Sequence, residues 1–192
     1  MQLSVKGKQL DVGDALRTHV AGSLEHILSK YFGDAIDANV TLAPEAHLFR
    51  AVVTAHVGRH IQLEAHGEAG DVYAAFDMAA ERLSKRLRRH KRRLRDHHKD
   101  GGDQDTLPAQ QYILAGDHQE DTGSDDEGRP AVVAEMLTEI PSLTVSEAVM
   151  RMDLADQPAM MFRNSAHGGL NMIYRRPDGN IGWIDPQGNP GA

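Results

Sequence analysis

Ten lysine and arginine residues between Arg82 and Lys99 form the densest group of side chains in this sequence that could do chemistry. Asp96 is the only acid among them, and the next 29 residues, 100–128, contain nine acids and no lysine or arginine. Cationic side chains at this density bind polyanions, above all nucleic-acid phosphates, because binding releases condensed counterions. The pattern therefore predicts a phosphate-binding segment followed directly by an acidic segment.

Net charge has to be read by segment, because the value of −7 for the whole chain conceals the reversal. Residues 1–99 contain 16 basic and 12 acidic residues, a net charge of +4, whereas residues 100–192 contain 5 basic and 16 acidic residues, a net charge of −11. A basic module and an acidic module are thus joined in one chain.

RNA backbone and shape are the expected targets of the basic segment, because arginine and lysine on several helix faces position a protein without reading bases. Few aromatic residues interleave with the cations, which argues against a single-strand stacking platform and favours structured or duplex RNA. The predicted RNA-binding residues are Lys85, Arg86, Arg88, Arg89, Lys91, Arg92, Arg93 and Arg95.

Two alternatives for the basic segment stay open. The cations could form a solvated helix face with no partner, which is the common reading of a charge run. The acidic segment that follows could also fold back on the helix and mimic a nucleic acid, in addition to RNA binding.

Other chemistry is not indicated. The chain has 11 histidines and no cysteine, and it lacks an HExxH motif or another zinc-ligand pattern. It also lacks a glycine-rich phosphate loop and a GxSxG nucleophile elbow. We therefore expect no catalytic residue, no metal, no cofactor and no small-molecule substrate.

Hydrophobic periodicity predicts a β-α-β-β-β-α domain over residues 1–99. In the long helix, apolar residues such as Phe76, Leu83 and Leu87 recur on one stripe. We expect two helices on one face of a four-stranded sheet. The predicted strands are 2–6, 36–42, 48–57 and 60–66, and the predicted helices are 14–32 and 71–98.

Residues 100–128 are acidic, glycine-rich and poor in apolar side chains, which is the composition of a flexible linker. Within them, Tyr112, Ile113 and Leu114 form a short apolar island. It could dock on a partner or on the first domain, or it could be incidental.

Residues 129–192 are predicted to form a small β-α-β-β-β domain. An apolar run at 131–137 comes first, and Thr144 with Glu147 forms a capping box before a helix that begins at Val145. The predicted strands that follow are 159–164, 170–176 and 180–185. The whole chain is therefore expected to be α+β.

Self-association is the expected source of additional stability for this second domain, because 64 residues without disulfides or a metal supply a marginal core. Its strands carry more apolar side chains than one helix can cover, and a second copy would cover the rest. The predicted dimerisation residues are Met161, Phe162, Met172, Tyr174, Trp183 and Ile184.

The subcellular location is suggested by the lack of a membrane-spanning segment and of a signal peptide. No apolar run approaches 18 residues, and the first 14 residues do not have the apolar stretch of a signal peptide. We expect a cytoplasmic protein with no membrane partner.

Several motifs resemble the long-form ribosome hibernation-promoting factors, a family that includes ribosome-associated inhibitor A and was once called sigma-54 modulation protein. The matching stretches are Gly7-Lys8 with DALRTHV, DVYAAFDMAAERLSKRLRRHKRR from Asp71 to Arg93, EAVMRMD, MFRNS and LNMIYRRPDGNIGWIDP. They cover both ends of the chain and leave out the acidic segment. Arg86 stands where this family usually has glutamine.

The resemblance implies that the first domain sits in the messenger and transfer RNA path of the small ribosomal subunit. There it would contact ribosomal RNA through the basic helix and block translation. The resemblance also implies that the second domain homodimerises and so pairs two ribosomes. A general RNA-binding or transcription-side regulator that uses the same helix is the alternative.

Overall fold

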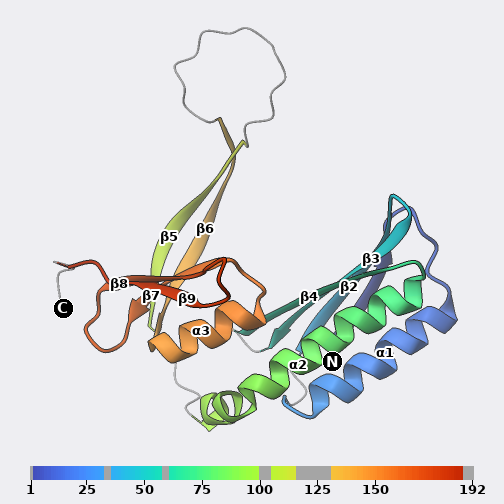
Figure 1. Cartoon of the computed structure of the whole chain (residues 1–192), viewed down its shortest axis with the longest axis horizontal. Coiled ribbons are helices and arrows are strands. Elements are labelled where there is room, and N and C mark those ends of the chain that lie inside the picture. The colour runs from blue at the N-terminus through green and yellow to red at the C-terminus, as the bar shows by residue number, and fades with distance from the viewer. Residues whose placement is uncertain (1, 33–35, 58–60, 100–104, 116–130, 188–192) are drawn as a thin grey trace, which may run out of the picture.

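The computed structural model describes residues 2–32, 36–57, 61–99, 105–115 and 131–187, which form an α+β structure with two sheets (Figure 1). The first sheet has the strand order β1-β2-β3-β4. Strand β1 runs parallel to β2, and the other neighbours are antiparallel. Its strands are β1 (Gln2–Gly7), β2 (Ile36–Glu45), β3 (Leu48–Val57) and β4 (Ile61–Ala69).

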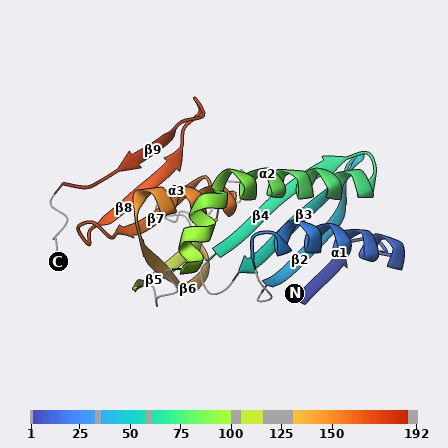
Figure 2. The same cartoon turned by 90° about the horizontal axis from the view of Figure 1, so that it is seen from below.

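Helices α1 (Asp14–Ser29) and α2 (Val72–Lys99) lie side by side on one face of this sheet (Figure 2). Every fourth residue of α1 is buried from Leu16 to Leu28, and α2 buries Phe76, Leu83 and Leu87. These side chains meet the alternate inward residues of the strands in one core. The predicted β-α-β-β-β-α order and the placement of both helices on one face are confirmed.

Gly67 allows α2 to approach β4 closely. A Cβ atom at this position would lie 2.3 Å from the carbonyl oxygen of Ala75 and 2.7 Å from the amide nitrogen of Ala79. Since both atoms belong to the helix backbone, no side-chain rotation could relieve the overlap. The missing side chain therefore sets the distance at which α2 packs, and with it the position of the basic residues that follow.

The second sheet has the strand order β5-β6-β7-β8-β9. Strands β5 and β6 form a long antiparallel ribbon, and only Ser142 and Leu143 of β6 pair with β7 (Figure 1). Its elements are β5 (Thr106–Leu114), β6 (Val132–Leu143), α3 (Val145–Leu154), β7 (Ala159–Asn164), β8 (Leu170–Arg175) and β9 (Ile181–Ile184).

Strand β5 corrects the expectation of a linker that runs through 100–128. Residues 106–114 pair with β6 over nearly its whole length, so the apolar island Tyr112–Leu114 is part of the second sheet. The segment TLPAQQYIL lacks the strict alternation of apolar and polar residues that marks a half-buried strand, because neither face of the ribbon is covered and both remain largely exposed. Residues 100–104 and 116–128 of the expected linker lie outside the described residues.

Helix α3 begins as predicted. The side chain of Thr144 accepts a hydrogen bond from the backbone N–H of Glu147, and the Glu147 carboxylate accepts one from the backbone N–H of Thr144. This reciprocal capping box satisfies two amide groups that otherwise lack partners at the helix start.

Two opposite faces of α3 are buried against different parts of the chain. Ala148 and Met152 pack with Phe162 and other residues of the second sheet. Met150 and Leu154, fully buried, belong instead to the core of the first sheet and its helices. The helix is therefore shared between the two halves of the molecule, as its position between the sheets shows (Figure 1).

Candidate nucleic-acid interface

The cations of α2 form two rows along the helix. Residues three or four positions apart lie above one another on an α-helix. Arg82, Arg86 and Arg89 thus share one row, which borders the apolar stripe and is called here the inner row. The second row faces away from the sheet and is called the outer row; it contains Lys85, Arg88, Lys91 and Arg92.

The outer row is open to solvent, and all four side chains are exposed. Lys85 pairs with Glu81 one turn earlier at 2.7 Å. For Arg88, Lys91 and Arg92, no ion pair is found within the described part of the chain. Like charges this close repel one another within a helix, so an anionic partner on this side would reduce the repulsion among these cations.

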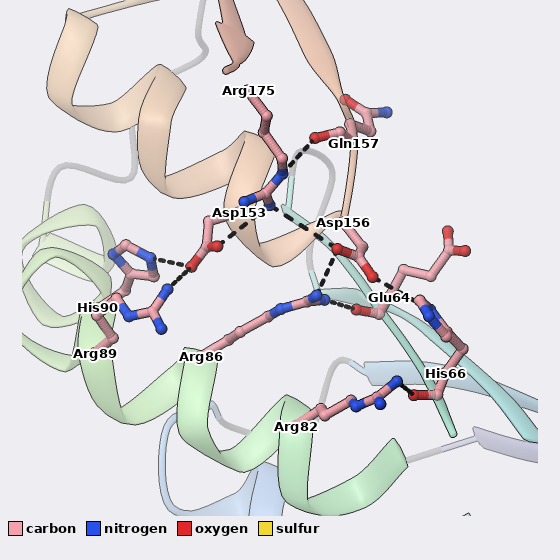
Figure 3. Close-up of polar contacts among 10 residues, drawn as sticks. All are labelled: Glu64, His66, Arg82, Arg86, Arg89, His90, Asp153, Asp156, Gln157 and Arg175. Atoms are coloured by element: carbon pink, nitrogen blue, oxygen red, sulfur yellow. Dashed lines mark hydrogen bonds and ion pairs between the residues drawn. The ribbon is translucent and has the colours of Figure 1, made fainter. Parts of the chain in front are cut away.

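The inner row is occupied by the protein itself (Figure 3). Arg82 donates a hydrogen bond to the backbone carbonyl of His66 at 2.6 Å, and Arg86 donates one to the carbonyl of Glu64, also at 2.6 Å. Both carbonyls belong to β4, the last strand of the sheet, whose outer edge has no neighbouring strand in that sheet. The two arginines therefore protect an open sheet edge.

Two acids of the α3 region complete the contacts of the inner row. Asp156 accepts a hydrogen bond from Arg86 at 2.5 Å and lies 3.3 Å from Nδ1 of His66. Asp153 accepts from Arg89 at 2.9 Å and lies 2.8 Å from Nε2 of His90. Arg86 and Asp156 are half-buried, with side-chain exposures of 17% and 19%.

Asp153 is nearly buried, and its surroundings favour the charged form. Burial by itself would raise the pKa of this carboxyl group. The hydrogen bond from His90, the charge of Arg89 and the hydrogen bond from Arg175 outweigh burial and lower the pKa to about 2. Asp153 is therefore ionised at neutral pH and serves as the common anion for three basic side chains.

The predicted RNA-binding residues thus divide into separate groups. Lys85, Arg88, Lys91 and Arg92 are exposed on the outer row, whereas Arg86 and Arg89 contact acids of the α3 region. The side chains of Arg93 and Arg95 lie outside the described residues. The expectation that residues 100–128 fold back on α2 falls largely on residues that are not described either.

Sequence reasoning missed Asp153 and Asp156. Both are polar residues near the end of a short helix, and nothing local to them indicates a partner more than 60 positions earlier. Asp156 lies two residues after the end of α3, in a position where glycine is common, which is at most a weak signal.

The predicted dimerisation residues also fall on two faces of the second sheet. Met161, Met172 and Ile184 are cross-strand neighbours on the face opposite α3. Met161 is 50% exposed and Ile184 is 48% exposed, so this face is open. The Tyr174 ring lies on the same face and covers Gly182, its cross-strand partner.

Phe162 and Trp183 do not lie on the open face with Met161, as a shared dimer surface would require, but on the α3 side of the second sheet. Phe162 is fully buried beneath α3 and belongs to the core of the second sheet, where a partner protein cannot reach it. Trp183 lies on the α3 side at the sheet edge and is 53% exposed, and its ring N–H donates to Asn171 at 2.8 Å. The strand period of two places these residues on the side opposite Met161 and Met172.

Further exposed apolar residues lie on the β5–β6 ribbon. A two-stranded ribbon is marginally stable by itself, and this one extends away from the rest of the chain (Figure 1). Its exposed large apolar side chains are Leu107, Tyr112, Ile113, Leu114, Val132, Val133, Met136 and Leu137.

Neither a metal-binding cluster nor a membrane-spanning helix is found among the described residues. Among the side chains that the structure describes, no three histidine or acidic groups are arranged to hold a metal ion. In the described ranges, no helix combines the length and the apolar character needed to span a bilayer.

Known proteins resemble this chain along nearly its full length. A protein from Rhizobium meliloti named ribosome hibernation promotion factor is 38% identical over 185 residues, which cover 96% of this chain and 97% of that protein. A protein of the same name from Bradyrhizobium diazoefficiens is 38% identical over 198 residues, 98% of this chain and 96% of that protein. The solved structure of the Thermus thermophilus Protein Y N-terminal domain is 27% identical and covers 46% of this chain and 98% of its own, with a TM-score of 0.42.

Two family models match the two halves of the chain. Residues 3–95 match the model described as sigma 54 modulation protein / S30EA ribosomal protein, and residues 127–182 match the model of the C terminus of the same family. The first match contains both cation rows of α2, and the second contains α3 and its two acids. The chain therefore belongs to the sigma 54 modulation protein / S30EA ribosomal protein family, as a long-form member that carries both the N-terminal and the C-terminal domain.

Proposed function

We propose that this chain is a non-enzymatic ribosome hibernation factor: it binds ribosomal RNA of the small subunit in the messenger and transfer RNA path and inhibits translation there. Membership of the family and relatives named ribosome hibernation promotion factor support the ribosome-associated role. The outer row of α2 carries the proposal, because its four cations are exposed and, among the described residues, only Lys85 forms an ion pair with an acid. Its place of action would be the cytoplasm, with ribosomes.

RNA recognition in this proposal is electrostatic. The outer row offers cations over about two turns of a helix that the core holds rigidly, which suits a phosphate backbone of fixed geometry. Exposed aromatic residues are scarce on α2. Tyr73 is 37% exposed, and its ring is in contact with the ring of His19. Stacking on unpaired bases would therefore contribute little.

Dimerisation through the second sheet is the other part of the proposal, and it would pair two ribosomes. The open row of Met161, Met172 and Ile184 and the apolar ribbon β5–β6 support it. An exposed apolar surface of this kind on a small sheet marks a protein interface. A second copy would cover it with the same surface in a symmetric pair.

Binding of purified small ribosomal subunits tests the RNA part of the proposal. Arg88→Gln with Arg92→Gln should weaken binding and make the affinity less sensitive to salt, because each lost phosphate contact lowers the salt slope by about one. Gln replacement of Arg50 on β3 and of Arg176 just after β8, which pair with Glu45 and Asp178, is the charge-matched control.

An unchanged salt slope in the Arg88 and Arg92 variant would remove the outer row from RNA binding. Equal affinity for small subunits and for unrelated RNA would favour the alternative, a general RNA-binding or transcription-side regulator. That alternative uses the same cations but requires no ribosome specificity.

A further inference from the structure

The inner row of α2 is held by two carboxylates from another part of the chain. Asp156 contacts Arg86 and His66, and Asp153 contacts Arg89 and His90 (Figure 3). Arginine binds carboxylate and phosphate with the same donor geometry. The acids of the α3 region therefore occupy cations that RNA phosphates could otherwise use.

Asp156 adopts a backbone conformation that glycine would adopt more easily. Its φ angle is +53°, in the left-handed region. The N–H of Asp156 donates to the carbonyl of Asp153, and the N–H of Gln157 donates to that of Met152, so the turn is a Schellman motif with an acid at the usual glycine position. The unfavourable conformation places the carboxylate against Arg86, and this contact offsets it.

The end of α3 adds to the negative potential at this place. The last carbonyls of a helix carry partial negative charge, and they favour nearby cations. Arg175 lies between the two acids, 3.3 Å from Asp153 and 3.9 Å from Asp156, and donates to the carbonyl of Gln157 at 3.1 Å. Two carboxylates and a helix terminus thus face the inner row together.

Apolar packing accompanies these ion pairs. Met150 and Leu154 of α3 are fully buried in the core of the first sheet. The α3 region is therefore docked on the N-terminal half of the molecule, and the docked arrangement places its acids at Arg86 and Arg89. Removal of α3 would expose this part of the helix.

We propose that Asp153 and Asp156 act as an internal substitute for RNA phosphates, which holds the C-terminal domain on the inner row of α2 and competes with RNA for Arg86 and Arg89. The inference rests on the RNA binding proposed above for α2. The outer row remains available in the docked form and makes the first contact with RNA. Full engagement of the inner row then requires the C-terminal domain to leave α2, which couples ribosome binding to release of that domain.

Opening of the full chain is measured first. Because the chain has no cysteine, Thr41→Cys and Ser165→Cys introduce one spin label in each half, both at exposed positions. Pulsed electron paramagnetic resonance should show one dominant, narrow distance distribution for the otherwise unchanged chain. Asp153→Asn with Asp156→Asn should broaden this distribution, because asparagine keeps the shape and tolerates the left-handed conformation but carries no charge.

Affinity for purified small ribosomal subunits is measured next. If the docked form holds about 90% of the molecules, the double variant should bind about tenfold more tightly. Glu25→Gln with Asp178→Asn removes the same charge from exposed positions and is the matched control, which should bind within about twofold of the unchanged chain. Asp156→Asn alone leaves the contacts of Asp153 in place and should give part of the gain in affinity. This single variant keeps the test possible if the double variant does not fold.

Addition of small subunits to the labelled chain separates the outcomes. A shift toward the distances of the double variant supports competition. Retention of the narrow distribution in the bound state, or equal affinity of the double variant and the charge-matched control, overturns it. If the unchanged chain does not bind subunits at all, the proposed function fails, and the same measurements with a 20-base-pair RNA duplex decide the competition by themselves.

Discussion

The guanidinium group of Arg86 donates to the carboxylate of Asp156 at 2.5 Å, and this contact joins the middle of α2 to the turn after α3, 70 positions later in the chain. Arg86 also donates to the carbonyl of Glu64 at the edge of β4. One side chain thus connects the sheet edge, the basic helix and the C-terminal domain.

A double-mutant cycle with Arg86→Gln and Asp156→Asn should show a coupling of about 1–2 kcal/mol in the free energy of unfolding, because the pair is half-buried and charge-assisted. Arg86→Gln should cost more than Asp156→Asn, since it also removes the donor to Glu64. Urea unfolding of the four proteins measures both effects. Additive single changes would mean that the pair contributes no stability of its own.

Gly67→Ala should destabilise the N-terminal domain by about 1–3 kcal/mol, because the new methyl group overlaps the backbone of α2. Gly22→Ala is the matched control, since a Cβ at this exposed position of α1 meets no atom within 4 Å. It should stabilise the helix by about 1 kcal/mol. Thermal unfolding compares the two, and a Gly67→Ala protein as stable as the parent would contradict the close packing.

Thr144→Ala should destabilise α3 by about 1 kcal/mol, because the amide N–H of Glu147 loses its acceptor. Thr144→Ser retains the hydroxyl group and should stay within a few tenths of a kcal/mol of the parent. Hydrogen exchange of the first turn of α3 reports the change directly. Equal protection in the alanine and serine variants would exclude a role for the cap.

Asp153 should make stability depend on pH in the acid range. Its pKa is lowered from 3.8 to about 2 in the folded chain, so the folded state binds its proton less readily than the unfolded state. The resulting stabilisation, about 2 kcal/mol, is complete above about pH 4 and disappears as the pH falls to about 2. Asp153→Asn should therefore be less stable than the parent at pH 6, with the difference closing toward pH 2.

Urea unfolding of the parent and of Asp153→Asn between pH 2 and 6 checks this dependence. Glu25→Gln, an exposed acid for which the described residues show no ion pair, gives the baseline. A difference that stays constant over this range would show that Asp153 acts through shape and not through charge.

Met161→Lys with Ile184→Lys should weaken self-association of the full chain by about a hundredfold, because two charges would be buried in the proposed apolar interface. Met78→Lys, at a methionine on α2 that is 39% exposed, is the control and should leave association unchanged. Analytical ultracentrifugation measures the equilibrium. A parent chain that stays monomeric at micromolar concentration would contradict the dimer.

Much of the secondary structure could be predicted from the sequence. The predicted strands 48–57 and 159–164 and the start of α3 at Val145 agree with the structure residue by residue. Periodicity and capping depend on residues within a few positions of one another, and such signals survive without any knowledge of the fold. Strand β5 was missed because its exposed residues give only a weak local strand signal, and its pairing with β6 is a contact between segments that are separated along the chain.

The sequence by itself determined that a dense set of cations would lie on one helix, since the types and the helical spacing of those residues are local properties. Only the tertiary structure decided which cations stay open. Arg86 and Arg89 meet Asp156 and Asp153 because Met150 and Leu154 bury α3 against the first domain, a contact between residues more than 60 positions apart. Long-range packing of this kind follows from the shape of the whole core, which no local pattern contains.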